Sequence, residues 1–343
     1  MKLSLRIFFM AFLTFSAFAL CVAATESDAA EKIRVGVMKF DSKAMSFDGK
    51  TNNVDDRQAG IITDMFTQIL ASGSKSITVR ERSEIERIGE EIILGIGSHP
   101  ECPDRITNIG RILGLQYMLY GSVTDLRESS SMAAVSILAT VKRETLATIE
   151  VRVIDVAAGE VILTLAETGA ASNSSSTLSS GDIVLSKEEE LGDIKVRAAR
   201  DASVRLAHRI RAELCGEYAY VLSESDGEFT IDQGEASGAE NGAPYLVYVD
   251  GPELLGVNGN AIGRKKIPLA LLKVTRTESN HSVCKVAPPS NGELIRRGDK
   301  VEPIFSEEAK RMGHWHWPKA RPKIEGSDDT YNRLFGDEND TPK

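Results

Sequence analysis

The sequence predicts an α/β (α+β) domain, in which one sheet carries packed helices, followed by a small all-β barrel or sandwich domain. Between residues 33 and 214, segments of alternating apolar residues are interspersed with segments whose apolar residues recur at helical spacing. From Gly216 onward, short strand-like segments and frequent glycines replace this pattern. A length of 343 residues suits about two domains, and 42% hydrophobic residues are enough for ordinary cores.

The first domain, assigned to residues 31–215, is expected to run strand, helix, strand, two helices, four strands, helix. Its predicted strands cover residues 33–40, 76–81, 117–126, 136–141, 147–156 and 160–167. Its predicted helices cover residues 59–71, 83–93, 104–115 and 194–214. Ala157-Ala158-Gly159 forms a turn between the last two strands. The serine-rich residues 129–131 and 171–181 predict a break and a mobile segment.

The second domain, assigned to residues 216–304, has no helical pattern. Glycines punctuate its predicted strands, which cover residues 218–223, 229–232, 244–250, 269–275 and 282–286. Residues 305–343 lack periodicity and are rich in Asp, Asn, Lys and Pro, so they predict a disordered tail. Within that tail, His314-Trp315-His316-Trp317 either docks on a partner or membrane interface or belongs to an inert segment.

Residues 1–24 have the pattern of a secretory signal peptide. Lys2 and Arg6 precede an uncharged apolar run, and Val22-Ala23-Ala24 places small residues before a cleavage site between Ala24 and Thr25. Acidic residues follow, where a membrane anchor would have a basic stop. Cys21 is an alternative lipidation site, but bulky Leu20 directly before it favours a cysteine that is removed with the signal.

Charge and composition exclude several function classes. The formal net charge of -9 argues against binding nucleic acid through bulk charge, and removal of the signal would make the chain more acidic. No later stretch is long and apolar enough to predict a transmembrane helix. Aromatic residues make up only 6%, which is low for a lipid-embedded sheet protein.

Motifs for catalysis or metal binding are weak. No Gly-x-Ser-x-Gly motif is present, and the five histidines are not grouped with a nucleophile and a carboxylate. Gly95-Ile96-Gly97 lacks the context of a phosphate-binding loop and suits a helix end. His99-Pro-Glu-Cys102 and His314-Trp-His316 have no second ligand pair for zinc. We therefore expect no enzyme activity, catalytic residue, cofactor or metal.

Three cysteines remain after signal cleavage, and an oxidising compartment allows one disulfide. Cys102 lies just before one helix of the first domain and Cys215 just after its last helix. We therefore expect a Cys102–Cys215 pair, and reduced cysteines are the alternative.

The long helix at residues 194–214 has an apolar face with Leu206, Ile210 and Leu214. Its other face is basic, with Lys195, Arg197, Arg200, Arg205, Arg209 and Arg211. A solvated face is the expected interpretation, and docking onto an acidic neighbouring subunit is the alternative.

Several of these segments resemble the curli production assembly/transport component (CsgG) family. The resemblance rests on IRVGVMKF at 33–40, SITVRERSEIERIGEE at 76–91, IGRILGLQYMLYGSVTDL at 109–126 and ATIEVRVIDVAAGEVI at 147–162. Residues 216–304, with FTIDQGEASGAENG at 229–242 and IRRGDKVEP at 295–303, resemble the C-terminal domain of the flagellar assembly protein T (FlgT) family.

The first resemblance implies an oligomeric outer-membrane secretion channel with two membrane-inserted β-hairpins per subunit. Residues 132–143 and 171–191 correspond to those hairpins, but they predict neither full membrane length nor a regular lipid-facing alternation. We therefore expect a non-enzymatic periplasmic component, associated peripherally with the outer membrane. It would contact itself or envelope assembly proteins while a curli- or flagellum-like structure is built or exported. The alternatives are a channel subunit and an exported enzyme or ligand binder that uses the cleft between the two domains.

Overall fold

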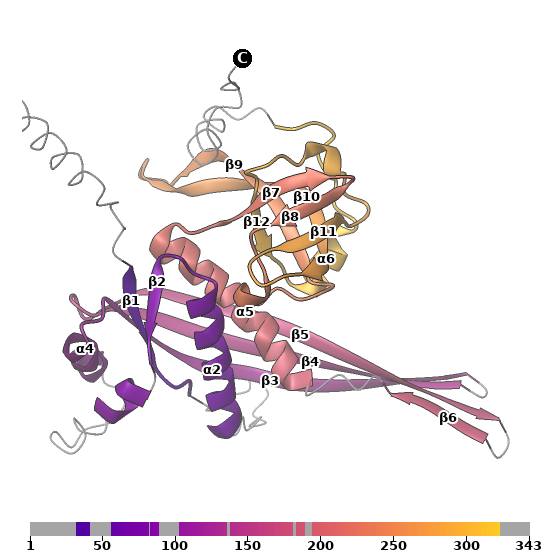
Figure 1. Ribbon diagram of the computed structural model, residues 1–343, viewed down its shortest axis with the longest axis horizontal. Helices are drawn as coiled ribbons and strands as arrows, with labels where there is room; N and C mark the ends of the chain where they lie inside the picture. The colour runs from indigo at the N-terminus through magenta and orange to yellow at the C-terminus, as the bar shows by residue number, and fades with distance from the viewer. Residues whose placement is uncertain are drawn as a thin grey trace, which may run out of the picture. The chain divides into compact units, whose positions relative to one another are not determined.

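The computed structural model describes residues 32–41, 56–81, 83–88, 103–135, 138–180, 183–188 and 194–322. Within this part, the chain forms a six-stranded mixed sheet with helices, followed by a closed barrel (Figure 1). The predicted fold class is therefore confirmed. The predicted signal peptide, with its cleavage site between Ala24 and Thr25, lies outside the described residues.

The six-stranded sheet has the order β2-β1-β3-β4-β5-β6. Its strands are β1 (Ile33–Val37), β2 (Ile77–Arg80), β3 (Tyr117–Val135), β4 (Leu138–Asp155), β5 (Glu160–Ser180) and β6 (Ile183–Glu188). Its helices are α2 (Asp56–Ser72), α4 (Pro103–Ile112) and α5 (Ile194–Cys215), and residues 83–88 are also helical. β1 pairs in parallel with β2 and β3, and the later strands pair antiparallel. Helices lie between the parallel strands along the chain, whereas the antiparallel strands β4 and β5 are joined by a short turn at residues 156–159.

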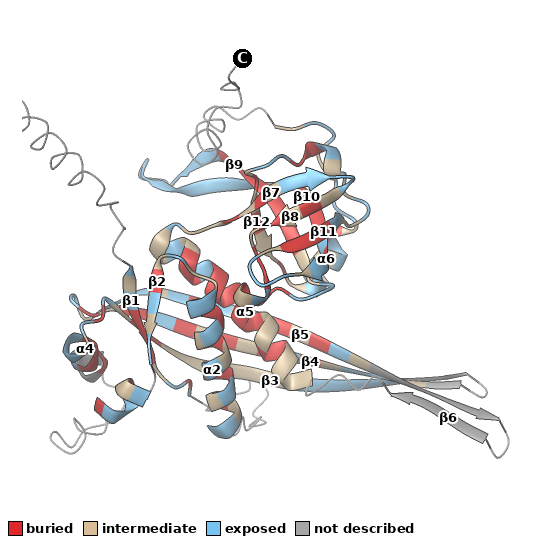
Figure 2. Ribbon diagram, in the orientation of Figure 1, coloured by how far each residue is buried: buried red, intermediate tan, exposed pale blue. Residues whose placement is uncertain are grey.

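Helices cover both faces of this sheet, as the period of two along each strand requires. Leu119 and Val153 belong to a core formed with α2 and α5, whereas their neighbours Met118 and Ile154 belong to a second core with α4. Figure 1 shows α2 and α5 side by side over the strands, and Figure 2 shows the buried positions beneath them. The central strands are therefore buried on both faces.

Gly169 on β5 determines how closely α5 approaches the sheet. A Cβ atom at this position would overlap the carbonyl oxygen of Ala198 and the amide nitrogen of Ala202. Ala198, Ala199 and Ala202 are fully buried, so the helix contributes only methyl groups to this part of the contact. Small residues on both elements thus bring the helix backbone directly against the strand.

The C-terminal part of the chain is a closed barrel with the order β10-β11-β8-β7-β12-β9, which selects the barrel over a sandwich. The strands are β7 (Ala219–Ser225), β8 (Glu228–Ile231), β9 (Pro244–Leu255), β10 (Ala261–Thr277), β11 (Ser282–Val286) and β12 (Lys300–Pro303). Two short 3-10 turns, η1 (Glu235–Ser237) and η2 (Gly292–Leu294), connect them. The interior contains Val221, Phe229, Val247, Leu272 and Cys284.

Two predictions about the sheet strands are wrong. The break expected at residues 129–131 lies inside β3, and the segment expected to be mobile at 171–181 belongs to β5 as far as Ser180. β4 pairs with β3 on one side and with β5 on the other along almost its whole length. This two-sided pairing outweighs the low strand preference of serine, because strand formation depends mainly on neighbouring strands.

The prediction of a disordered tail from Phe305 is wrong for residues 305–322. Ser306–Met312 forms helix α6, and buried Met312 packs with Leu246, Leu271 and Ile304. Further along, Arg321 donates from Nη1 and Nη2 to the carboxylate of buried Asp299, at 2.8 and 2.6 Å. A few specific anchors hold this segment on the barrel, so a periodicity analysis misses it. Residues 323–343 lie outside the described residues.

We expect Gly169→Ala to destabilise the protein by about 2–3 kcal/mol, because the added methyl forces α5 away from β5. Urea denaturation of the purified protein measures this change. Gly60→Ala is the matched control, since a Cβ at Gly60 in α2 meets nothing within 4 Å. The control should be neutral or stabilising by up to about 1 kcal/mol. Equal effects of the two substitutions would contradict the close-packing argument.

We expect Arg321→Ala to destabilise the barrel by about 1–2 kcal/mol, because it leaves the buried Asp299 carboxylate without its cation. Lys319→Ala, at an exposed position two residues earlier, is the control and should change stability by less than about 0.5 kcal/mol. Thermal unfolding compares the two variants. An unchanged melting temperature for Arg321→Ala would mean that the tail does not stabilise the barrel.

Candidate functional site

Helix α5 contacts the sheet with one face and residues of the barrel and its C-terminal extension with the other. Leu206 and Ile210 pack in the sheet core. On the opposite side, Arg200 Nε lies 2.5 Å from Glu240 Oε1 in the barrel region. The guanidinium of Arg205 lies 5.1 Å from the ring centroid of Phe305. The helix therefore connects the two sheets.

The prediction that the basic face of this helix is solvated is wrong for its central residues. Arg205 and Arg211 are only 6% and 2% exposed. Arg205 donates to the carbonyl of Thr168 in β5 and pairs with Asp201, while Arg209 pairs with Glu167 at 2.5 Å. These acidic partners belong to the same chain. The alternative, docking onto an acidic neighbouring subunit, stays a prediction.

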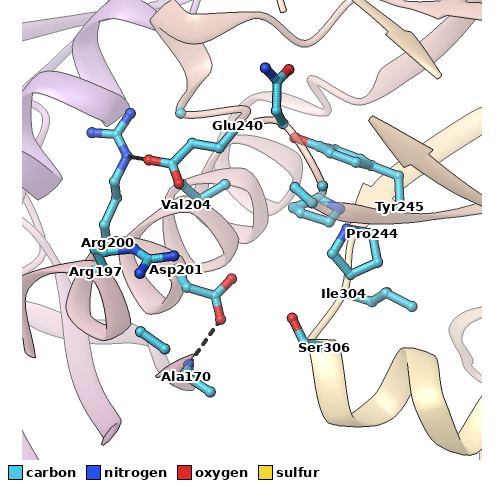
Figure 3. Close-up of a pocket in the computed structure, with 16 residues that line it drawn as sticks. Ala170, Arg197, Arg200, Asp201, Val204, Glu240, Pro244, Tyr245, Ile304 and Ser306 are labelled. Carbon is cyan, nitrogen blue, oxygen red and sulfur yellow. Dashed lines mark hydrogen bonds and ion pairs between the residues drawn. The ribbon is translucent and has the colours of Figure 1, made fainter. Parts of the chain in front are cut away.

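A cleft of about 200 Å³ lies between α5 and the start of β9 (Figure 3). Its charged and polar lining consists of Arg197, Arg200, Asp201, Glu240, Asn241, Tyr245 and Ser306. The Asp201 carboxylate accepts a hydrogen bond from the amide of Ala170 at 3.0 Å. Burial raises the pKa of Asp201, and Arg205 opposes that rise. Arg200 pairs with Glu240 and Asp201 pairs with Arg205, whereas Nη1 of Arg197 is buried with no hydrogen-bond partner among the described residues.

A larger cavity of about 440 Å³ lies at the C-terminal end of α5, where His208, Arg211 and Cys215 line it. Burial, with smaller contributions from Arg211 and Lys266, lowers the pKa of His208 to about 3. Burial also raises the pKa of the Cys215 thiol to about 11. At neutral pH the imidazole is therefore uncharged and the thiol protonated. These two groups do not form an activated nucleophile and base pair.

The β9–β10 hairpin extends as an exposed arm, defined here as residues 252–266. Every described residue in it is exposed except half-buried Gly256. The apolar side chains of Leu254, Leu255, Val257 and Ile262 are exposed to solvent. Exposed apolar side chains grouped in this way are typical of interaction surfaces. The sequence offered a signal here, since LLGV precedes a turn, but the glycines obscured the strands.

The second candidate surface is the strand extension, defined here as β3 and β4 beyond the pair Arg127–Leu146, β5 beyond Ala170, and β6. β3 and β4 stay in register from Arg127–Leu146 as far as Val135–Leu138. β5 and β6 pair from Ser175–Glu188 to Ser180–Ile183. The hairpin expected at residues 132–143 is therefore longer than expected, because β3 and β4 pair along almost their whole length. In the hairpin expected at residues 171–191, β5 and β6 pair only between residues 175 and 188. Among the described residues, no helix is long and apolar enough to cross a membrane.

Several of the other predicted site residues cannot be placed together or apart, because they fall in a part of the chain that the structure does not describe. Cys102, His99 and Gly95–Gly97 lie outside the described residues, so the Cys102–Cys215 disulfide stays a prediction. Cys215 ends α5, whereas Cys284 is buried in the barrel, and these two do not pair with each other. Of the two tail tryptophans, Trp315 is exposed and Trp317 packs beside the Leu246 cluster.

Comparisons with solved structures give similarities of low TM-score. Lipoprotein GNA1162 from Neisseria meningitidis is 11% identical, with a TM-score of 0.26, covering 41% of this chain and 83% of that chain. The PelC dodecamer from Paraburkholderia phytofirmans is 14% identical, with a TM-score of 0.24, covering 50% and 83%. Hypothetical protein CT253 from Chlamydia trachomatis is 10% identical, with a TM-score of 0.30, covering 54% and 99%. None of the curated proteins matches the chain.

The family comparison is more informative, because it covers more than half of the sequence. Residues 17–214 match the family described as curli production assembly/transport component CsgG. The match ends one residue before α5 ends, so it spans the six-stranded sheet and leaves out the barrel. The chain belongs to the curli production assembly/transport component CsgG family.

Proposed function

We propose that this protein is a non-enzymatic component of the bacterial envelope that helps to build or export a surface structure through protein–protein contacts. Its family membership over residues 17–214 carries the proposal. The leader pattern of residues 1–24 supports a periplasmic location with peripheral outer-membrane association. The cargo would be curli- or flagellum-like. The likeness of residues 216–304 to the FlgT C-terminal domain is part of this proposal.

Self-association is the second part of the proposal, and the arm is the surface that we assign to it. Coverage by a neighbour would remove exposed apolar surface from water and so lower the free energy of the complex. The side chains concerned are Leu254, Leu255, Val257 and Ile262. Arg264 and Lys265 lie beside them, and the chain as a whole carries a charge of -9. A second copy therefore offers a predominantly acidic surface to a basic, apolar-tipped arm.

A second candidate function is an outer-membrane channel subunit. The strand extension favours it, because β3, β4 and β5 are 19, 18 and 21 residues long. Of those residues, 128–135, 138–145 and 171–180 lie in the extension itself, so each strand there approaches the roughly 10 residues that a membrane-crossing strand needs. A third candidate, an exported ligand binder, is favoured only by the cavity at the end of α5.

Cell fractionation with measurement of native mass distinguishes the first two candidates. If the protein is the proposed scaffold, it should be recovered in the soluble periplasmic fraction, and its N-terminus should be Thr25. A channel subunit should require detergent and give ring-shaped oligomers. Replacing residues 132–141 with Asn-Gly shortens the first hairpin behind the Ser131–Lys142 pair. This variant should not change the location of a scaffold, whereas it should release a channel subunit from the membrane.

We expect the double variant Leu255→Ser and Val257→Ser to weaken self-association at least tenfold, because it removes exposed apolar area from the arm. Sedimentation at several protein concentrations measures the change. Val161→Ser and Ile162→Ser, at another pair of exposed apolar positions, form the control and should leave association unchanged. Identical association of the two double variants would show that the arm is not the contact surface.

A further inference from the structure

The cavity of about 440 Å³ at the C-terminal end of α5 is lined in part by polar residues that solvent can reach. Lys75, in the connection between α2 and β2, is exposed. Tyr218 and Tyr220, at the start of the barrel, and Asp232, directly after β8, are half-buried. The volume lies within the range of small-molecule sites, and these four residues leave surface for a ligand to contact.

The polar ends of three of these side chains are free. Within the described part of the chain, no hydrogen bond engages the hydroxyl of Tyr218 or Tyr220, and neither hydroxyl is among the buried atoms without a partner. The Lys75 ammonium likewise has no ion pair there. A phenol hydroxyl both donates and accepts hydrogen bonds, an ammonium donates and a carboxylate accepts. The lining therefore offers donors and acceptors together.

The ring of Tyr218 and the backbone of Tyr220 are held in place before a ligand arrives. Lys300 Nζ lies 3.6 Å from the ring centroid of Tyr218, and it is itself fixed by Asp250 Oδ2 at 2.6 Å. The amide of Tyr220 donates to Asp232 Oδ1 at 2.6 Å, and its carbonyl accepts from the amide of Asp232 at 3.1 Å. Groups that keep their positions in the free protein lower the entropy cost of binding.

The charges around the cavity balance. Lys75 and Arg211 are cationic, whereas Glu217 and Asp232 are anionic. His208 is uncharged at neutral pH, because burial lowers its pKa to about 3. Arg211 adds charge but no donor that a ligand could reach, since both of its Nη atoms are buried. A lining of this kind attracts neither anions nor cations through its overall charge, and an uncharged ligand leaves the balance unchanged.

We propose that this cavity binds a neutral saccharide. Sugar hydroxyls donate and accept, so they can pair with the free hydroxyls of both tyrosines, with the Lys75 ammonium and with the Asp232 carboxylate. The C–H faces of a sugar ring are apolar and suit the amphipathic surface of a tyrosine. A hydrocarbon ligand would cover these polar groups without giving them partners, which is costly. The proposal concerns a ligand and does not depend on the proposed scaffold role.

Thermal unfolding of the purified protein tests the proposal, with maltose, cellobiose, lactose and N,N′-diacetylchitobiose titrated separately through the millimolar range. We expect at least one disaccharide to raise the melting temperature saturably by about 2 °C or more. Sorbitol is the control for the general stabilising effect of excluded polyols, which grows with concentration and does not saturate. No saturable rise with any of the four sugars would overturn the proposal. A larger saturable rise with sodium glucuronate would overturn the assignment of a neutral ligand.

The double variant Tyr218→Phe and Tyr220→Phe locates the effect. It keeps both rings and removes two hydroxyls that have no partner in the described residues, so the melting temperature of the free protein should change by less than about 1 °C. The affinity for the disaccharide should fall about tenfold, because two hydrogen bonds to the ligand are lost. An unchanged affinity would contradict binding at these tyrosines.

Tyr117→Phe is the matched control, because Tyr117 in β3 is also half-buried but does not line the cavity. It should retain the full response, and a loss there would mean that the response is not specific to the cavity. Lys75→Gln keeps a donor and removes the charge, so a neutral sugar should bind it within about fivefold of the original affinity. A larger loss would show that charge recognises the ligand and would overturn the assignment of a neutral saccharide.

Discussion

Much of the fold depends on how closely α5 approaches β5. The contact consists of one glycine on the strand and alanines on the helix, so the two backbones nearly touch. Side chains of ordinary size there would move the helix outward, and both of its faces would lose their partners. The sheet core beneath Leu206 and Ile210 and the ion pairs above Arg200 and Arg205 would change together. A single steric requirement thus connects the packing of the two sheets.

The ion pairs of α5 also follow from its position between the sheet and the barrel. A helix covered on one face presents cations to solvent, but a helix covered on two faces must find a partner for each one. Arg205 and Arg209 both pair with Glu167, and Arg205 also pairs with Asp201. Arg200 pairs with Glu240. Arg211, by contrast, has no such partner in the described residues. The helix therefore has an unsatisfied charge at the end that faces the larger cavity.

The sequence predicted elements well where one pattern dominated. The strand at residues 282–286 has the expected bounds, and the helix predicted at 194–214 ends one residue later. Prediction from the sequence failed where the contacts that determine the structure join residues far apart in the chain. Serines at 172–180 follow no strand pattern, yet β4 and β6 pair with them. Glycines in the arm interrupt the alternation that would have extended the strands predicted at 244–250 and 269–275.

The candidate sites were harder to predict for the same reason. The sequence shows six cations on one helix, with Asp201 four residues before Arg205, but not that Glu167 and Glu240 lie opposite them. The alanines at 198, 199 and 202 of that helix are a usable signal, because small residues gathered on one helix face favour close packing of that face. Gly73 beside Arg211 has no local sequence signal, since the contact joins residues that are far apart.

The pairing of β4 on both sides has a mechanical consequence. A pull along the strand axis at the tip of the strand extension would load the ladders β3–β4 and β4–β5 in shear, so many hydrogen bonds would resist it at once. Within the described part of the chain, β6 pairs with β5 alone and over only six residues, so it would detach at much lower force. The extension therefore consists of three strands, β3 to β5, that resist a pulling force together and are continuous with the helix-packed sheet. Its fourth strand, β6, is released easily.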